Sequence, residues 1–413
     1  MNISILAVGT ELLMGKTVNT NATELSKMIN DLGHSVKYHL TIGDNPDRLA
    51  SSLEFLLGVS DMVITTGGLG PTQDDLTKET IAKAFDLELK LDQKALDMMV
   101  DRFKNFNVTM TENNKKQAYL PEGSITMYND RGTAPGFISS SFDKIVAALP
   151  GPPREMRMMF DKSLKPFLLE KSDKVIKSEY INLFGIGESS AETRVEDIIS
   201  NQTNPTIAIY ANIGQVSLRI TALANTEDEA SELLKPVVAQ ITDRLKDYVL
   251  GYGEKSLVDY TFEALYNSPY TLTIAESCTG GMIASELINY SGASKFLDRS
   301  FVTYSNEAKE EVLSVSKDIL NKYGAVSEET CFAMLEGLEK NTTGDIHLAV
   351  TGIAGPTGGS PDKPIGLVYI GTRFNGKSFV KKFNFTGDRY VIRRRSMLSA
   401  MHMLLSGIKD TCK

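Results

Sequence analysis

Short apolar runs alternate with helix-like patterns over roughly the first 170 residues. Apolar runs at 3–8, 35–42 and 61–65 are separated by segments of helical periodicity at 19–32 and 46–57. Strands that alternate with helices pair in parallel through right-handed crossovers. We therefore expect an open, doubly wound sheet whose ligands lie at the carboxyl ends of its strands.

The pattern changes between about residues 172 and 252. An extended run at 175–184 precedes a short helix, two adjacent strands at 206–210 and 215–223, and a helix that ends near Tyr248. This order predicts a small α+β module. Its motif Gly185-Ile186-Gly187-Glu188-Ser189 has no clustered nucleophile and base, which favours a spacer or dimerisation role over catalysis. Residues 251–253 are expected to form a linker.

The alternation of strands and helices resumes at Glu254. Strands are predicted at 271–275, 300–304 and 346–351, followed by a hairpin at 367–385 and a helix from Asp388 to about Ser406. The expected fold is thus α/β: two doubly wound, mostly parallel domains, at 1–171 and 253–413, joined by the α+β module at 172–252.

Composition and charge exclude several classes of protein. The 413 residues are 42% hydrophobic and 23% charged, values of ordinary multidomain proteins. No apolar run approaches the roughly 18 residues of a membrane span. The amino terminus does not resemble a signal peptide and there are three cysteines, so we expect a reduced, cytoplasmic protein. A net charge of -8 argues against direct nucleic-acid binding, and any anionic ligand needs a local basic patch.

Histidines offer no metal site in this sequence. His34, His39, His347 and His402 have neither the spacing of a zinc motif nor paired cysteines nearby. Any metal ion would be held by carboxylates and by a substrate phosphate.

The loop after the third strand has the composition of an anion cradle. Gly67, Gly68 and Gly70 let backbone N–H groups approach a phosphate. Asp74 and Asp75 would repel a bare phosphate, so they are better interpreted as metal ligands, together with Asp44 after the second strand. The alternative is a simple turn in which Asp74 caps a helix.

A serine stands between a strand and a helix in the carboxy-terminal part. Ser277 is followed by Thr279, Gly280 and Gly281, and the helix N-terminus would favour developing negative charge. Lys309 is the available base for a Ser-Lys hydrolase, provided that burial or nearby cations lower its pKa. Cys278 is the rival nucleophile, although a small buried cysteine is its commoner role.

Further turns are expected at the same edge of that sheet. Thr351, Gly352 and Gly355 follow a strand and would donate to an oxyanion or a phosphate. Residues 377–395 hold seven basic side chains against one acid, Asp388, and form the required basic patch. Within it, Arg389 and Arg393 share a helix face and suit phosphate binding.

Three motifs resemble the competence/damage-inducible protein CinA family, over the whole chain. They are Gly9-Thr10-Glu11-Leu12-Leu13-Met14-Gly15, Thr66-Gly67-Gly68-Leu69-Gly70-Pro71-Thr72-Gln73-Asp74-Asp75 and Leu149-Pro150-Gly151-Pro152-Pro153-Arg154-Glu155-Met156. The amino-terminal part of that family resembles molybdopterin-binding domains, whose functional aspartates fall at Asp44 and Asp75. The resemblance implies hydrolysis of the pyrophosphate of ADP-ribose with a divalent metal.

The carboxy-terminal motifs resemble the nicotinamide mononucleotide amidohydrolase domain of the same family. They are 275–281, 304–309, 351–359 and Gly387-Asp388-Arg389. The resemblance implies conversion of nicotinamide mononucleotide to nicotinic acid mononucleotide and ammonia without a cofactor. We expect Ser277 as nucleophile and Lys309 as base, with Tyr304 and Thr351 orienting or polarising groups. Substrate contacts are expected from Thr279, Gly280, Gly281, Ser294, Gly352, Gly355 and Arg389.

Two other functions stay open at this point. One is a molybdopterin- or nucleotide-binding protein without turnover, in which Ser277 and Lys309 would be idle. The other is an interaction protein of DNA uptake or recombination. A homodimer is expected for the two-activity enzyme.

Overall fold

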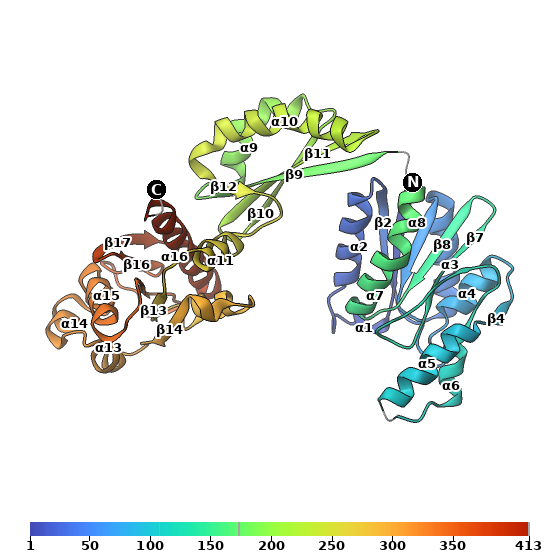
Figure 1. Cartoon of the computed structure of the whole chain (residues 1–413), viewed down its shortest axis with the longest axis horizontal. Helices are drawn as coiled ribbons and strands as arrows, with labels where there is room; N and C mark the ends of the chain where they lie inside the picture. Colours follow the sequence, from blue (N-terminus) through green and yellow to red (C-terminus); the bar gives the residue numbers. More distant parts are fainter. Residues whose placement is uncertain (107, 172–173, 412–413) are drawn as a thin grey trace. The chain divides into compact units, whose positions relative to one another are not determined.

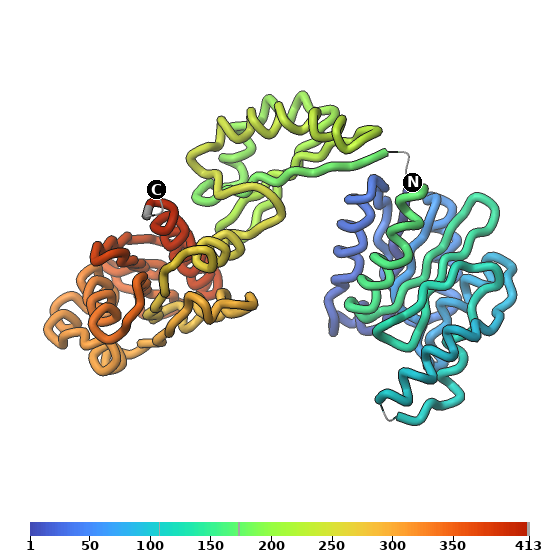
Figure 2. The backbone as a smooth tube through the Cα atoms, viewed as in Figure 1, coloured from blue at the N-terminus to red at the C-terminus, as the bar shows by residue number. Residues whose placement is uncertain are grey.

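A computed structural model describes residues 1–106, 108–171 and 174–411, whose path can be followed in Figure 2. Ser172, the expected start of the middle module, and Cys412 lie outside the described residues. The chain divides into two compact units, Met1–Ser178 with Ala222–Leu233 and Glu179–Thr221 with Leu234–Lys413. Among the described residues, no helix combines the length and the apolar character needed to cross a bilayer.

The amino-terminal domain is built on a six-stranded sheet of order β2-β1-β3-β8-β7-β6. Its strands are β1 (Asn2–Val8), β2 (Ser35–Ile42), β3 (Met62–Thr66), β6 (Ile125–Met127), β7 (Gly136–Ser141) and β8 (Lys144–Leu149). The predicted parallel pairing holds for β2, β1, β3 and β8. β7 and β6, which were not predicted, pair antiparallel in a sheet that stays mostly parallel, as expected. Only two residues separate β7 from β8, too few for the crossover that a parallel pair needs.

Helices cover both faces of this sheet (Figure 1), as expected for a doubly wound fold. Ile3 and Ile5 of β1 pack into one buried cluster and Leu6 and Val8 into another, because successive strand residues face opposite sides. The first cluster includes residues of α2 (Thr20–Asp31), α7 (Pro153–Met159), the π-helix η2 (Phe160–Leu164) and α8 (Lys165–Glu170). The second includes residues of α3 (Pro46–Val59) and α4 (Thr77–Ala84).

The segment between α4 and β6 adds elements for which the sequence patterns gave no expectation. It contains the strand pair β4 (Leu89–Leu91) and β5 (Tyr119–Pro121), the helices α5 (Gln93–Asn105) and α6 (Glu112–Lys115), and the 3-10 turn η1 (Lys116–Ala118). A short helix α1 (Thr10–Leu13) follows β1.

The middle module has a four-stranded sheet of order β10-β11-β9-β12. Its elements are β9 (Val175–Phe184), α9 (Glu188–Ser200), β10 (Thr206–Asn212), β11 (Gln215–Ala224), α10 (Glu227–Leu245), η3 (Lys246–Tyr248) and β12 (Val249–Tyr252). The interpretation of residues 251–253 as a linker is wrong for Gly251 and Tyr252. These two residues pair with Asn182 and Ile181 in the edge strand β12.

The carboxy-terminal domain has a five-stranded sheet of order β14-β13-β15-β16-β17. Its strands are β13 (Leu272–Glu276), β14 (Leu297–Val302), β15 (Ile346–Gly352), β16 (Leu367–Phe374) and β17 (Lys377–Asn384). The first three are parallel, and β16 and β17 form the predicted antiparallel hairpin. Asn375 and Gly376 close this hairpin with φ of 47° and 76°, the left-handed values of a two-residue turn.

Both faces of this sheet are also covered. Ile274 faces a cluster that includes residues of α11 (Leu257–Asn267), α12 (Met282–Ile288) and α16 (Arg389–Thr411). Ala275 faces the other cluster, with residues of α13 (Asn306–Leu313), α14 (Lys317–Tyr323) and α15 (Glu328–Asn341). The carboxyl ends of β13 and β15 therefore open together at one edge of the sheet.

Candidate functional sites

Ser277 lies in the turn that joins β13 to α12, at the carboxyl end of the sheet. Its backbone N–H donates to Val350 O at 2.9 Å, which ties the turn to β15. Gly280 and Gly281 continue the turn with φ of 61° and 88°, values that L side chains rarely adopt. The preceding Glu276 is fully buried, and its carboxylate accepts the N–H groups of Ile283 and Ala284, each at 3.1 Å.

The cap formed by Glu276 changes the electrostatics expected of this turn. Two of the unpaired N–H groups at the start of α12 already meet a carboxylate, so they are not free to bind an oxyanion. Negative charge that develops at Ser277 must therefore be stabilised by the turn itself and by cations nearby. The hydroxyl of Thr279 is a candidate donor, because it is buried and has no partner among the described residues.

The structure brings Lys309 and Ser277 together, although 31 residues separate them in the sequence. Lys309 lies in α13 and is 1% exposed. Its Nζ donates to Thr303 O at 2.8 Å and lies 3.2 Å from Ser277 Oγ. Burial lowers the pKa of this lysine to about 8. A substantial fraction of Lys309 is then neutral near physiological pH and able to accept a proton.

Burial makes Cys278 less reactive, whereas it makes Lys309 a better base. The cysteine side chain is buried, and burial raises the pKa of the thiol to about 12. Because the thiolate is the reactive form of cysteine, this thiol is a poor nucleophile at neutral pH. The local chemistry favours Ser277.

The other residues expected near Ser277 form different hydrogen bonds. Arg389 donates to Gly355 O at 2.7 Å and to the Tyr304 hydroxyl at 2.9 Å, and so joins two of the predicted loops. The Thr351 hydroxyl donates to Ala325 O at 2.7 Å, which commits its proton to a backbone carbonyl. Gly352 is the last residue of β15 and pairs with Val368.

Ser294 is the predicted residue that the fold does not bring to the others. It lies in the 3-10 turn η4 (Ala293–Lys295), which precedes β14, whereas Ser277 follows β13. Since β13 and β14 are parallel, these two positions fall at opposite edges of the sheet. Ser294 therefore has no contact with Ser277 within one chain.

A second constellation surrounds a cavity of about 540 Å³ in the amino-terminal domain. Among the residues that line it are Gly67, Gly68, Gly70, Asp44, Asp74 and Asp75 from the predicted set, with Glu11 and Glu155 from the other two motifs. Gly67 has φ of 100°, and a side chain there would collide with Val8 O. A side chain at Gly70 would likewise collide with the Asp75 carboxylate. The backbone thus requires Gly67, whereas Gly70 leaves room for the Asp75 carboxylate beside the cavity.

Threonine hydroxyls and amides hold the three aspartates in place. Asp44 Oδ2 accepts from the N–H and the hydroxyl of Thr10, each at 2.8 Å. Asp75 Oδ2 accepts from the Thr72 N–H at 2.9 Å, and the Thr72 hydroxyl also reaches Asp74. That hydroxyl lowers the pKa of the Asp74 carboxyl, which is solvent-exposed. The helix-cap interpretation of Asp74 is wrong, because α4 begins after Leu76 and has no side-chain cap.

The residues around this cavity suit a hard cation bound together with a phosphate. Five carboxylates line the cavity, and lysine, arginine and histidine are absent from its described lining. Yet the described residues contain no group of three histidine, cysteine or acidic side chains arranged to hold a metal ion unaided. Oxygens of a substrate phosphate would have to complete the coordination of any metal ion bound here.

Family models match three consecutive parts of the chain. They are "Probable molybdopterin binding domain" at residues 4–170, "Damage-inducible protein CinA KH domain" at 178–251 and "CinA C-terminal domain" at 254–408. A CinA-like protein of Dictyoglomus thermophilum is 47% identical over 408 residues, covering 99% of both chains. This chain belongs to the CinA family. A CinA-like protein of Kosmotoga olearia is 46% identical and covers 97% of both chains.

Solved structures of CinA relatives align with part of the chain. The competence/damage inducible protein CihA of Agrobacterium tumefaciens is 38% identical, covers 36% of this chain and 92% of its own, and has a TM-score of 0.36. The molybdopterin biosynthesis enzyme MoaB of a Thermus species is 16% identical and covers 41% of this chain, with a TM-score of 0.28.

In this CinA-family chain, Gln117 was not predicted as a site residue, and Arg393 was predicted in a different role. Gln117, from η1, is 3% exposed, lines the acidic cavity and donates to Leu69 O at 3.1 Å, while its Oε1 has no partner among the described residues. Arg393 donates to Cys278 O at 3.1 Å and to Thr279 O at 2.7 Å, so it braces the Ser277 turn. An isolated glutamine gives no sequence signal, and the arginine was predicted to bind phosphate.

Proposed function

We propose that the carboxy-terminal domain is an amidohydrolase that converts nicotinamide mononucleotide to nicotinic acid mononucleotide and ammonia. The observation that carries the proposal is the buried Lys309, whose pKa is lowered to about 8 and whose Nζ lies 3.2 Å from Ser277 Oγ. This pair supplies a nucleophile and a base without histidine. The identity of the substrate comes from the family resemblance.

The proposed reaction proceeds through an acyl-enzyme. Neutral Lys309 accepts the Ser277 hydroxyl proton as the oxygen attacks the carboxamide carbon. Collapse of the tetrahedral intermediate breaks the C–N bond, and Lys309 returns the proton to the departing ammonia. Lys309 then takes a proton from water, which attacks the ester and releases the carboxylate product and the free Ser277 hydroxyl.

The other residues of the site would bind and orient the substrate. Arg389 bridges the loops of Tyr304 and Gly355 at the rim, where a guanidinium can exchange a carbonyl partner for a phosphate. Arg393 holds the carbonyls of the turn behind Ser277, so that the nucleophile keeps its position. Thr279 has a buried hydroxyl free to donate to the oxyanion.

The decisive test compares two neighbouring side chains. Ser277→Ala and Cys278→Ala are each incubated with nicotinamide mononucleotide and EDTA, and ammonia release is measured. Ser277→Ala is expected to lose at least about a thousandfold in kcat, as for other covalent nucleophiles, while Cys278→Ala keeps most of its activity. Near-normal turnover of Ser277→Ala, or a folded Cys278→Ala that is dead, would refute the mechanism.

We also propose that the amino-terminal domain hydrolyses the pyrophosphate of ADP-ribose. The glycine loop and the oxygen-rich wall of its cavity support this assignment, because carboxylates beside a phosphate require a cation between them. Asp44, Asp74 and Asp75 would hold a divalent metal, which would neutralise phosphate charge and activate water when bound. Gln117 and Glu155 would supply further acceptors.

Metal removal and one substitution test this second activity. EDTA should abolish ADP-ribose cleavage, and addition of a divalent metal should restore it. Asp75→Asn should lower the turnover by about a hundredfold or more, because one ligand charge is lost. The matched control is Asp47→Asn, an acid on α3 outside the cavity. Unchanged cleavage by Asp75→Asn, or cleavage in the absence of metal, would contradict the assignment.

A further inference from the structure

The middle module and the carboxy-terminal domain enclose a cavity of about 670 Å³ that neither proposed activity uses. All of its lining residues belong to the second compact unit. Its lining includes the motif Gly185-Ile186-Gly187-Glu188, which takes no part in either proposed activity. Other lining residues come from β17 and α16.

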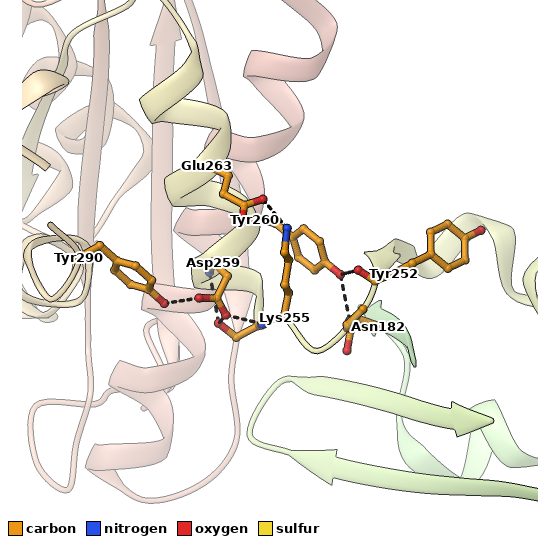
Figure 3. A network of polar contacts seen from close by, with 9 residues as sticks. Asn182, Tyr252, Lys255, Asp259, Tyr260, Glu263 and Tyr290 are labelled. Carbon is orange, nitrogen blue, oxygen red and sulfur yellow. Dashed lines mark hydrogen bonds and ion pairs between the residues drawn. The ribbon is translucent and has the colours of Figure 1, made fainter. Parts of the chain in front are cut away.

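Polar contacts, drawn in Figure 3, connect residues of the two parts. Asn182 of β9 donates to Gly253 O at 2.7 Å and to the Tyr260 hydroxyl of α11 at 2.9 Å. The Tyr260 hydroxyl in turn donates to Tyr252 O at 2.9 Å. Gln215, which lines the cavity, accepts from the Leu257 N–H at 2.9 Å.

Five aromatic side chains line the cavity, beside aliphatic residues such as Ile186 and Leu398. Phe184 stacks on His402, with ring centroids 4.6 Å apart, and Phe383 stacks on Phe385 at 5.2 Å. Burial lowers the pKa of His402, and the nearby Lys381 and Lys409 act in the same direction. The imidazole is therefore neutral at pH 7 and acts as a flat ring. Together with Tyr248, these rings suit a planar aromatic ligand.

The polar part of the lining suits an anion. Lys381 and Arg395 reach the cavity, although Glu188 and Asp247 offset their charge. The helix α9 begins there after Gly187, and no side chain caps its first N–H groups. Ser399, which is 6% exposed, adds a hydroxyl to this polar part of the lining.

We propose that this cavity binds a free mononucleotide, with the base against the aromatic rings and the phosphate near Arg395 and the start of α9. A mononucleotide combines the planar apolar group and the compact anion that the lining accommodates separately. Neither a purely apolar ligand nor a simple anion would use both. A single nucleotide is favoured over a nucleic-acid strand because the chain carries a net charge of -8 and Glu188 and Asp247 stand at the cavity.

The absence of tryptophan from the chain provides a local reporter. Tyr248→Trp places a single indole at the cavity of the full chain, and stacking of a base should quench its fluorescence. Adenosine 5′-monophosphate is the probe, with adenosine and inorganic phosphate as partial ligands. We expect saturable quenching by the monophosphate and at least roughly tenfold weaker binding of adenosine, which lacks the charged group.

Matched substitutions in the reporter background locate the site. Arg395→Ala and Lys381→Ala should each lower the affinity for the monophosphate by about tenfold. Lys382→Ala, one residue outside the lining, should leave that affinity unchanged. Ser277→Ala and Asp75→Asn should bind the monophosphate with unchanged affinity. That result would distinguish this site from the two proposed active sites. Circular dichroism checks that Arg395→Ala is folded, and Lys381→Ala provides a second test if it is not.

Several results would overturn the proposal. One is the absence of saturable quenching at millimolar monophosphate, and another is equal affinity for adenosine and the monophosphate. A third is unchanged affinity in both Arg395→Ala and Lys381→Ala. The last is tighter binding of a single-stranded oligonucleotide than of the monophosphate.

Discussion

At the scale of single residues, the protonation of Lys309 decides what the carboxy-terminal site can do. The lysine is enclosed between Ser277 and three backbone carbonyls, those of Thr303, Tyr304 and Ser305, and has no carboxylate partner among the described residues. Such carbonyls satisfy the ammonium group only in part, so desolvation dominates and its pKa falls. Burial is thus the physical origin of the base.

The pH dependence expected of the proposed amidase follows from this shift in the Lys309 pKa. The neutral lysine is the active form, so kcat/KM should increase as the pH rises through about 8. Below that value the rate should fall by about tenfold per pH unit. The measurement is ammonia release from pH 6 to 10 at saturating and at low substrate. A flat profile, or a midpoint near the ordinary lysine pKa, would argue against Lys309 as the base.

The same shift has a consequence for stability, which serves as a control for the pH profile. Between about pH 8 and 10.5 the unfolded chain binds the Lys309 proton more tightly than the folded chain does. The contribution of Lys309 to the free energy of unfolding therefore increases with pH over this window. Lys309→Met should abolish that contribution, as the difference between the denaturation curves of the variant and the parent would show.

At the scale of elements, Arg389 and Arg393 lie on one face of the first turns of α16 but contact different parts of the site. Arg389 is exposed and reaches outward to Tyr304 and Gly355, whereas Arg393 is half-buried against the Ser277 turn. Sequence spacing alone assigned both to phosphate. The packing of α16 beside α12 separates their roles, because only the outer residue can exchange its partners for a substrate.

Kinetics of two alanine variants should separate these roles. Arg389→Ala should mainly raise KM for nicotinamide mononucleotide, by about tenfold or more, because a charge-assisted contact is lost. Arg393→Ala should mainly lower kcat, because the nucleophile turn loses its brace. Activity toward the dephosphorylated nucleoside is the control, and it should be insensitive to Arg389→Ala. Similar KM and kcat effects in both variants would contradict this division.

At the scale of the whole molecule, the two proposed active sites are built from separate sheets. Ser277, Lys309 and Arg389 all come from elements after Gly253, whereas the acidic cavity is lined entirely by residues before 156. Each sheet has its own pair of buried clusters. The chemistry of one domain therefore needs no residue of the other.

A fragment that begins at Gly253 tests this independence. It should keep the amidase kcat within a few-fold, because the site is complete within it. It should unfold at a lower temperature than the full chain, since the bonds from Asn182 and Gln215 are lost. Thermal unfolding and ammonia release are measured together. A folded but inactive fragment would show that the site needs the rest of the chain or a second subunit.

The α/β class, most of the strands and helices, and the loops that carry polar side chains could be predicted from the amino-acid sequence. Alternating apolar runs identify buried strands, and glycine- and acid-containing turns at their ends identify the reactive edge. Local patterns of this kind arise from short-range preferences, so they can be read without the fold. The antiparallel partners β6 and β7 and the strand β12 were missed because pairing direction depends on distant segments.

The fold was needed to see which of these residues lie together and how burial changes their pKa values. Ser294 and Ser277 are both serines near strands, but parallel pairing puts them at opposite edges of the sheet. Glu276 takes the helix amides that the sequence assigned to an oxyanion, and burial gives Lys309 and Cys278 pKa values that favour the lysine–serine pair. Desolvation and hydrogen-bond partners are properties of the packed chain, because they depend on neighbours that the sequence does not place.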